Sequence, residues 1–210
     1  MPIIFEDFFP DDIRVAVWKI NEPESVLREH YSSIRSVPPL PYKSGIRRKQ
    51  ALAARLCLHY LIPESEGHYL RGSDGSPLVD SPDHHISISH AGLHAAVAAS
   101  SGKIGIDLEV ISEKPLKLLH RFCFSEEFDL LDFDLHGMVV KATIIWSFKE
   151  ALFKLMDRKG WDFAKDFRLV EVRAETNFLR GFYLDRGSKK EVAGFFRFFD
   201  DSLFVLVHAC

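Results

Sequence analysis

Two carboxylates stand in an apolar segment of the chain, Ile-Gly-Ile-Asp-Leu-Glu at 104–109. The alternation predicts a strand, on which Asp107 and Glu109 point to one face with side chains about 6–7 Å apart. Two carboxylates at this spacing can share Mg²⁺, which prefers oxygen ligands. Gly105 allows another backbone or a ligand to come close. The alternative is a strand end that leaves the core, with both acids solvated.

A second segment, Trp-Ser-Phe-Lys-Glu-Ala-Leu-Phe-Lys at 146–154, predicts a helix with charges beside aromatic rings. At about 100° per residue, one face is apolar and comprises Ile145, Phe148, Leu152 and Leu155. An adjacent stripe comprises Trp146, Lys149, Glu150, Phe153 and Lys154. Ser147 and Ala151 are left for solvent. Charged groups in a helix buried nearly all round need partners. The alternative is a Glu150–Lys154 salt bridge on a surface helix.

Basic residues upstream of these two segments are candidates for binding an anion. Arg47, Arg48 and Arg55 project within an arc of about 100° on the helix expected at 47–62. Clustered arginines bind phosphate or carboxylate through bidentate hydrogen bonds. Arg71 is a weaker candidate of the same kind. The alternative is a solvated basic face.

A further polar pair, Ser89-His90, follows the alternating residues 86–88 and precedes a turn at Gly92. This position leaves His90 at the tip of a strand, where it can donate a hydrogen bond to phosphate. The alternative is an ordinary polar residue with its hydrogen bonds satisfied.

Composition restricts the class of protein. The 210 residues suffice for one large domain or two small lobes, and 47% hydrophobic with 27% charged residues is ordinary for a globular protein. The net charge of −3 gives no reason to expect nucleic acid or an anionic membrane as a partner. The three cysteines are interpreted as reduced thiols. No signal peptide and no apolar run of about 18 residues is evident. These features predict a cytoplasmic protein.

The order of elements predicts an α+β fold. Strands are expected at 13–20, 85–89, 94–100, 103–110, 167–173, 178–184, 191–199 and 202–208, with turns at 72–75 and 80–83. Helices are expected at 47–62 and 139–158, and a helical region at 114–135. A helix and short antiparallel strands occur in each half, which suggests two related lobes.

Taken together, Gly105-Ile106-Asp107-Leu108-Glu109 and the 146–154 segment resemble the 4'-phosphopantetheinyl transferases, specifically the larger Sfp-type group. Ser89-His90, the arginine-bearing helix and Phe124-Ser125-Glu126-Glu127 agree with the family pattern. The resemblance spans roughly residues 47–154. It implies a pseudo-dimer of two similar lobes, 1–101 and 102–210. Each lobe is a helix packed on a small antiparallel sheet, and the active site lies in the cleft between them.

The resemblance also implies the reaction. Phosphopantetheine is transferred from coenzyme A to a serine of an apo acyl, peptidyl or aryl carrier protein, and adenosine 3',5'-bisphosphate is released. We expect the partners to be coenzyme A and the carrier, with Mg²⁺ as cofactor and a monomeric enzyme. The basic and apolar segment 114–122, with Lys114, Lys117 and Arg121, is a candidate dock for an acidic carrier.

Roles for individual residues follow from the same resemblance. The implied metal ligands are Asp107, Glu109 and Glu150. The catalytic candidates are Glu150 as first choice for the base, Glu127 as second, and Lys154 for stabilising charge on the leaving phosphate. The residues implied to hold coenzyme A are Arg47, Arg48, Arg55, Arg71, Ser89, His90, Lys149 and Lys154.

The chain departs from the family pattern at two positions. Ser76 stands where many relatives have a lysine, so a contact to coenzyme A is missing, and Arg71 is a candidate to replace it. Ala54 stands where relatives often have glycine. Two alternative functions are a Mg²⁺-dependent phosphohydrolase, which would use the same carboxylates on a coenzyme A-like pyrophosphate, and a non-catalytic scaffold. The scaffold would bind coenzyme A through the basic cluster and His90 and would not require Asp107, Glu109 and Glu150 together.

Overall fold

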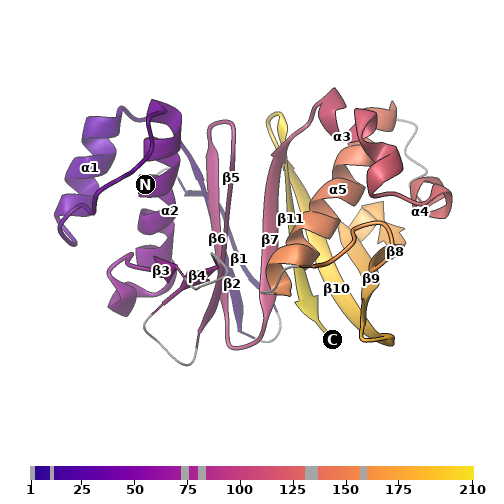
Figure 1. Cartoon of the computed structure of the whole chain (residues 1–210). Helices are drawn as coiled ribbons and strands as arrows, with labels where there is room; N and C mark the ends of the chain where they lie inside the picture. The colour runs from indigo at the N-terminus through magenta and orange to yellow at the C-terminus, as the bar shows by residue number, and fades with distance from the viewer. Residues whose placement is uncertain (1–2, 10–11, 72–75, 80–83, 131–136, 157–159) are drawn as a thin grey trace. The chain divides into compact units, whose positions relative to one another are not determined.

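The computed structural model describes residues 3–9, 12–71, 76–79, 84–130, 137–156 and 160–210. The chain divides into two compact units, Met1–Gly102 and Lys103–Cys210. Each contains an antiparallel sheet and a long helix packed on it (Figure 1). The expected mixed α+β class is therefore confirmed.

The first unit is built on a four-stranded sheet in the order β1-β2-β6-β5. Its strands are β1 (Ile3–Phe9), β2 (Ile13–Lys19), β5 (His85–Ala91) and β6 (His94–Ser100). Its helices are α1 (Glu24–Ser32), α2 (Gly45–Leu61) and a 3-10 turn at Pro63–Ser65. A small pair of strands, β3 (Leu70–Arg71) and β4 (Pro77–Leu78), completes it. Helix α2 packs on β2 and β6, and α1 packs on α2 (Figure 1).

The core of the first unit explains why α2 forms where the sequence predicts it. Strand β6 is buried along its whole length and consists mainly of alanine and valine, so α2 can approach it closely. Leu52, Cys57 and Leu58 of α2 are fully buried against the sheet and α1. Strand β1 and helix α1 were not expected from the sequence.

The second unit is built on a five-stranded antiparallel sheet in the order β7-β11-β10-β9-β8. Its strands are β7 (Ile104–Val110), β8 (Phe167–Arg173), β9 (Phe178–Asp185), β10 (Ser188–Phe199) and β11 (Ser202–Ala209). Its helices are α3 (Glu113–Lys117), α4 (Ser125–Asp129) and α5 (Gly137–Leu155), with 3-10 turns at Leu119–Arg121 and Ala174–Thr176. Helix α5 lies across the sheet and contacts β7 and β11 (Figure 1).

The expected apolar face of α5 is confirmed: Ile145, Phe148, Leu152 and Leu155 are all at most 1% exposed. The expectation that Ser147 and Ala151 face solvent is wrong, since both are fully buried. Ala151 is buried because β7 passes directly beneath it. A Cβ added at Gly105 would overlap the carbonyl oxygen of Ala151. The close approach predicted at Gly105 is therefore made by the backbone of α5.

The helical region expected at 114–135 is not one helix. It consists of α3, a 3-10 turn and α4, and Phe124 before α4 has an extended backbone with φ −91° and ψ 153°. Residues 131–135 lie outside the described part of the chain, as do the turns expected at 72–75 and 80–83. The other expected strands are present within about two residues at their ends, except that β10 begins three residues earlier.

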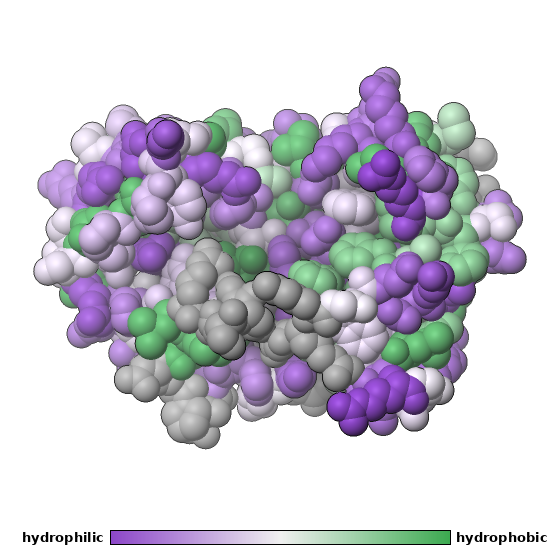
Figure 2. All heavy atoms as spheres, viewed as in Figure 1, coloured by the Kyte–Doolittle hydropathy of each residue, from purple (hydrophilic) through white to green (hydrophobic). Residues whose placement is uncertain are grey.

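On the face seen in Figure 2, hydrophilic side chains cover much of both units and smaller hydrophobic patches lie among them. The helices among the described residues are too short or too polar to span a bilayer.

Candidate active site

Strand β7 and helix α5 bring the two sequence motifs together. Lys154 of α5 donates a hydrogen bond to Oδ1 of Asp107 over 2.9 Å, and another to the carbonyl oxygen of Ile106 over 2.9 Å. The Asp107 side chain is 7% exposed and that of Lys154 is 29% exposed. The residues lie 47 positions apart in the sequence, so this contact depends on α5 crossing β7 at Gly105. The close crossing fixes the lysine over the strand.

The other two carboxylates of the motifs, Glu109 and Glu150, have raised pKa values. Burial and the Asp107 carboxylate raise the pKa of Glu150 to about 7, although the ammonium group of Lys154 opposes the shift. Burial and Asp107 also raise the pKa of Glu109, and a hydrogen bond from the Trp146 side chain opposes that shift. Both acids are partly buried. The Asp107 carboxylate, which contributes to the raised pKa of both Glu109 and Glu150, creates a negative potential that favours a cation.

The donor set has the right chemistry for a hard cation, because Asp107, Glu109 and Glu150 all offer carboxylate oxygens. Within the part of the chain that the structure describes, no group of three His, Cys, Asp or Glu side chains is arranged as a metal site. In the structure, Oδ1 of Asp107 accepts its hydrogen bond from Lys154. A cation at this oxygen would compete with the lysine.

Lys149 and Glu127 lie in the core of the second unit. Nζ of Lys149 lies 2.8 Å from Oε2 of Glu127 and also donates to the carbonyl oxygens of Phe122 (2.5 Å) and Phe163 (3.1 Å). Oε1 of Glu127 accepts from the backbone N–H of Leu169 over 2.8 Å. The two side chains are 0% and 1% exposed. This geometry favours a structural role for both, in place of the phosphate contact and the base expected from the sequence.

The first unit brings together only some of the expected anion-binding residues. Nη1 of Arg47 lies 2.8 Å from Nδ1 and 2.9 Å from Nε2 of His90. Arg47 is exposed and His90 is partly buried. The neighbouring Ser89 is buried, with 6% of its surface exposed. Arg47 and His90 therefore form one cluster, which an anion can reach from solvent.

The other arginines have partners within the unit. Arg48 forms an ion pair with Glu24 at 2.9 Å, which ties α2 to α1. Arg55 donates to the carbonyl oxygen of Ala51 over 2.9 Å, and its guanidinium lies 4.6 Å from the centre of the Tyr69 ring. The Arg71 backbone lies in β3, and its side chain is outside the described part. The three arginines of α2 thus have different surroundings.

In the segment considered as a carrier dock, Lys114, Lys117 and Arg121 are all exposed. Lys117 pairs with Glu113 over 2.8 Å, and both side chains are about 70% exposed. Such a pair is weak and leaves the lysine available.

Two partners in these clusters were not anticipated from the sequence. Trp146 was assigned to the mixed stripe of the helix but was not expected to act on Glu109. Glu24 holds both Arg28 and Arg48. The spacing of Glu24 and Arg28 at i,i+4 was a readable signal for α1, whereas the contact with Arg48 depends on how α1 packs on α2.

Comparison with known proteins shows a likeness over the second unit. Residues 103–193 match the family model of the 4'-phosphopantetheinyl transferase superfamily. The matched range contains Asp107, Glu109, Glu150 and Lys154. The resemblance that the motifs indicate is therefore confirmed over most of the second unit.

Individual relatives extend this likeness. The chain is 33% identical over 118 residues to the 4'-phosphopantetheinyl transferase Sfp of Bacillus subtilis (strain 168), which covers 55% of this chain and 52% of that protein. It is 31% identical over 98 residues to the 4'-phosphopantetheinyl transferase psf-1 of Bacillus pumilus, which covers 46% of this chain and 42% of that protein. It is 30% identical over 98 residues to the 4'-phosphopantetheinyl transferase gsp of Aneurinibacillus migulanus, which covers 46% of this chain and 41% of that protein. The matches span about half the length of these relatives or less.

Proposed function

We propose that this chain transfers 4'-phosphopantetheine from coenzyme A to a serine of an apo carrier protein, releasing adenosine 3',5'-bisphosphate. The observation that carries the proposal is the contact between Lys154 and Asp107, since it joins the two motifs into one charged cluster inside the matched region. The names of three relatives support the reaction class. The identity of the carrier is part of the proposal.

Mg²⁺ is the cofactor we propose for the carboxylate cluster. Asp107, Glu109 and Glu150 would hold it, and the raised pKa values of Glu109 and Glu150 are what a cation would relieve. When bound, the ion supplies neutralisation of pyrophosphate charge. Lys154 would then be available to a phosphate oxygen, because the cation would take its place at Asp107.

Side chains of the protein would accept the proton of the carrier serine and stabilise the charge on the leaving phosphate. The carrier serine attacks the phosphorus on the pantetheine side, its proton leaves, and the bond to the adenosine bisphosphate breaks. Glu150 is our choice for the base, since its carboxylate belongs to the same cluster as Asp107 and Lys154 and can accept a proton when it is ionised. Lys154 stabilises the charge that develops on the leaving phosphate. Glu127, which is buried against Lys149, is left out of this scheme.

The cluster of Arg47 and His90 is our candidate for the phosphate at the nucleotide end of coenzyme A. Two observations support it: the guanidinium is exposed, and the imidazole lies within 3 Å of it. Ser89, Arg55 and Arg71 stay candidates beside this pair. We assign Arg48 to the contact between α1 and α2, because Glu24 and two backbone carbonyls occupy its guanidinium.

The similar design of the two units supports a second part of the proposal. In each, one long helix, α2 or α5, packs on an antiparallel sheet. We propose that the units are related repeats within a monomer. Their main sheets differ in strand number and order, with four strands in the first unit and five in the second.

A direct experiment separates this function from its alternatives. The protein is incubated with coenzyme A, Mg²⁺ and a panel of apo acyl, peptidyl and aryl carrier proteins, and each carrier is weighed by mass spectrometry. A transferase adds one phosphopantetheine to a carrier, and replacing the acceptor serine by alanine abolishes the gain. Release of phosphopantetheine without any acceptor would indicate a phosphohydrolase. Binding of coenzyme A with no turnover would indicate a scaffold.

A further inference from the structure

A buried glutamine of α2 contacts the hairpin that carries His90. Nε2 of Gln50 donates a hydrogen bond over 2.9 Å to the carbonyl oxygen of Gly92, in the turn between β5 and β6. Gln50 is 4% exposed and is the first buried residue of α2. The N-terminal part of the helix is therefore joined to the hairpin by a directional contact, in addition to the apolar packing further along α2.

The turn of this hairpin is held at both of its residues. Gly92 and Leu93 connect β5 to β6, and Gly92 has a positive φ of 50°. The carbonyl oxygen of Leu93 accepts a hydrogen bond from the backbone N–H of Ile20 over 2.7 Å, and that of Gly92 accepts the bond from Gln50. The turn therefore cannot shift relative to α2 without losing a hydrogen bond.

Two contacts cross from α2 to this hairpin, and they start from neighbouring positions. Arg47 is three residues before Gln50, so both side chains project from the same side of the helix. His90 is two residues before Gly92 in the hairpin. Nη1 of Arg47 lies 2.8 Å from Nδ1 of His90. The bond from Gln50 to Gly92 thus limits the distance between the two backbone positions from which Arg47 and His90 extend.

The other half of the Gln50 amide adds no hydrogen bond within the described part of the chain. Oε1 is buried and has no partner there. A buried acceptor without a partner destabilises the folded state, so this amide stabilises the protein less than a fully bonded one would. An apolar side chain of similar length would remove the unpaired acceptor together with the donor. The bond to Gly92 is the part of the amide that such a side chain cannot replace.

We propose that Gln50 is a positioning residue for phosphate recognition. By holding the turn of the hairpin on α2, it keeps Arg47 and His90 at the spacing at which both bind one phosphate group. This inference rests on the proposed function, in which that pair binds the phosphate at the nucleotide end of coenzyme A. Gln50 does not touch the phosphate, since its amide is buried. Groups that are held in place before binding lose less conformational entropy when a ligand arrives, so the benefit is a higher affinity.

The test measures binding of two matched probes to the full chain, adenosine 3',5'-bisphosphate and adenosine 5'-phosphate, which differ by the 3'-phosphate. Isothermal titration calorimetry gives both affinities and needs no turnover. Gln50→Met should weaken binding of the bisphosphate about 3- to 10-fold and leave adenosine 5'-phosphate within about 2-fold. Gln50→Asn, whose amide is one methylene too short to reach Gly92, should give the same result.

A double variant distinguishes positioning from a general loss of structure. Arg47→Ala removes one of the two groups that Gln50 holds at their spacing. Adding Gln50→Met to Arg47→Ala should therefore change the affinity for the bisphosphate by less than about 2-fold. A further loss as large as that in the wild-type background would show that Gln50 acts independently of Arg47, against the proposal.

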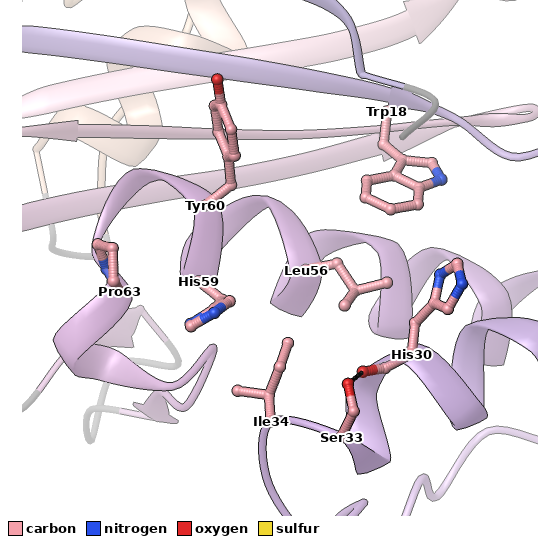
Figure 3. Close-up of a pocket in the computed structure, with 8 residues that line it drawn as sticks. All are labelled: Trp18, His30, Ser33, Ile34, Leu56, His59, Tyr60 and Pro63. Carbon is pink, nitrogen blue, oxygen red and sulfur yellow. Dashed lines mark hydrogen bonds between the residues drawn. The ribbon is translucent and has the colours of Figure 1, made fainter.

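Leu56→Ala is the control for stability. Leu56 lies further along α2, where its side chain faces Ile34 across an apolar pocket beside Trp18 (Figure 3). The leucine is 7% exposed, so removing its methyl groups should lower the melting temperature. The preference for the bisphosphate should nevertheless stay within about 2-fold of the wild type, because neither Arg47 nor Gln50 lines this pocket.

The possible failures are distinguishable. If Gln50→Met and Gln50→Asn kept the wild-type preference for the bisphosphate, the inference would be overturned and the proposed function would stand. If the wild type itself had no such preference, Arg47 and His90 would not form a phosphate site, and the inference would fail with that assignment. Weighing the carrier proteins tests the transfer reaction separately.

Discussion

Nζ of Lys149 lies 2.8 Å from Oε2 of Glu127 in the core, whereas Nζ of Lys154 on the same helix reaches Asp107 at the edge of the carboxylate cluster. The first lysine is fully buried, and the second is 29% exposed. Burial lowers the pKa of Lys149, although the Glu127 carboxylate opposes this shift. Lys149 therefore supports the fold, and Lys154 belongs to the carboxylate cluster of the proposed site.

Replacing Lys149 by Met should destabilise the protein strongly. The change leaves the Glu127 carboxylate buried without its cation, which costs about 3–5 kcal/mol in the free energy of unfolding. Lys154→Met should cost less, about 1–3 kcal/mol, because the lysine is 29% exposed, although the Asp107 carboxylate that it leaves is only 7% exposed. Urea unfolding measures both. Adding Glu127→Gln to Lys149→Met should restore part of the loss; similar losses for the two single variants would contradict the division of roles.

Replacing Lys154 by Met should reduce catalysis without unfolding the protein. If the ammonium group stabilises the leaving phosphate, kcat for carrier modification should fall about 100-fold or more, while KM for the carrier changes little. Lys154→Arg keeps the charge and should retain part of the activity. Mass spectrometry of the carrier over time gives the rates. A Lys154→Met enzyme with wild-type kcat would remove this residue from the mechanism.

The pKa of Glu150 makes the stability of the metal-free protein depend on pH. Its pKa of about 7 in the folded protein lies above the ordinary glutamate value of 4.5. Its stabilising contribution is therefore fully present below pH 4.5 and is lost as the pH rises towards 7. Glu150→Gln stays neutral, so we expect it to exceed the wild type by about 2 kcal/mol at pH 8 and to match it near pH 4.5. Urea unfolding in EDTA at both pH values tests this.

The exposed Glu126 is a suitable control for that experiment. Its pKa is lowered by its own backbone N–H and by Ser125, so the sign is reversed. Glu126→Gln should bring no gain in stability at pH 8. A Glu150→Gln variant that is no more stable than the wild type at pH 8 would show that the carboxylate is not held in an unfavourable environment.

Gly105→Ala should destabilise the second unit. The added Cβ would overlap the carbonyl oxygen of Ala151 and lie 2.8 Å from the backbone nitrogen of Leu155. Since backbone atoms cannot turn aside, α5 must move off β7, at a cost of about 2 kcal/mol or more. Gly102→Ala is the matched control, because its Cβ would meet only Oγ of Ser100 at 4.0 Å. Thermal unfolding of the two variants tests the close crossing, and equal melting temperatures would contradict it.

Arg47→Ala should change KM for coenzyme A much more than KM for dephospho-coenzyme A, which lacks the 3'-phosphate. Losing a charged hydrogen bond to this phosphate should raise KM for coenzyme A about 10- to 100-fold and leave KM for the dephospho form nearly unchanged. Arg48→Ala should lower the melting temperature through the loss of its contact with Glu24, without altering the KM ratio. If Arg47→Ala weakened both substrates equally, the residue would not recognise that phosphate.

Periodicity was sufficient to predict the apolar face of α5 and the strand at 167–173, which bury one face. The strands at 94–100 and 202–208 are buried along nearly their whole length and were predictable as short apolar runs. The sequence predicted that the motifs containing Asp107 and Lys154 form one site, but it did not predict the hydrogen bond between these two side chains. Strand β1 and helix α1 were both missed. For α1, Pro23 followed by Glu24 was a readable start signal.

The direction of Lys149 could not be read from the sequence. Five positions separate it from Lys154, which places the two side chains about 140° apart around the helix. Treating them as one stripe therefore joined residues that diverge. The partners of Lys149 include the carbonyl oxygens of Phe122 and Phe163, and no local pattern reveals which backbone groups will surround a lysine after folding.

Helix α5 rests on its sheet at two glycines. Gly105 lies beneath the backbone at Ala151, and Gly181 of β9 lies beneath the ring of Phe148, where a Cβ would overlap it. Sliding or rolling of the helix would have to break both close contacts. Glu150 lies on the same helix, one residue from the contact at Ala151. In the proposed site, the carboxylates would therefore adjust to a phosphate through side-chain torsions, without a displacement of the helix.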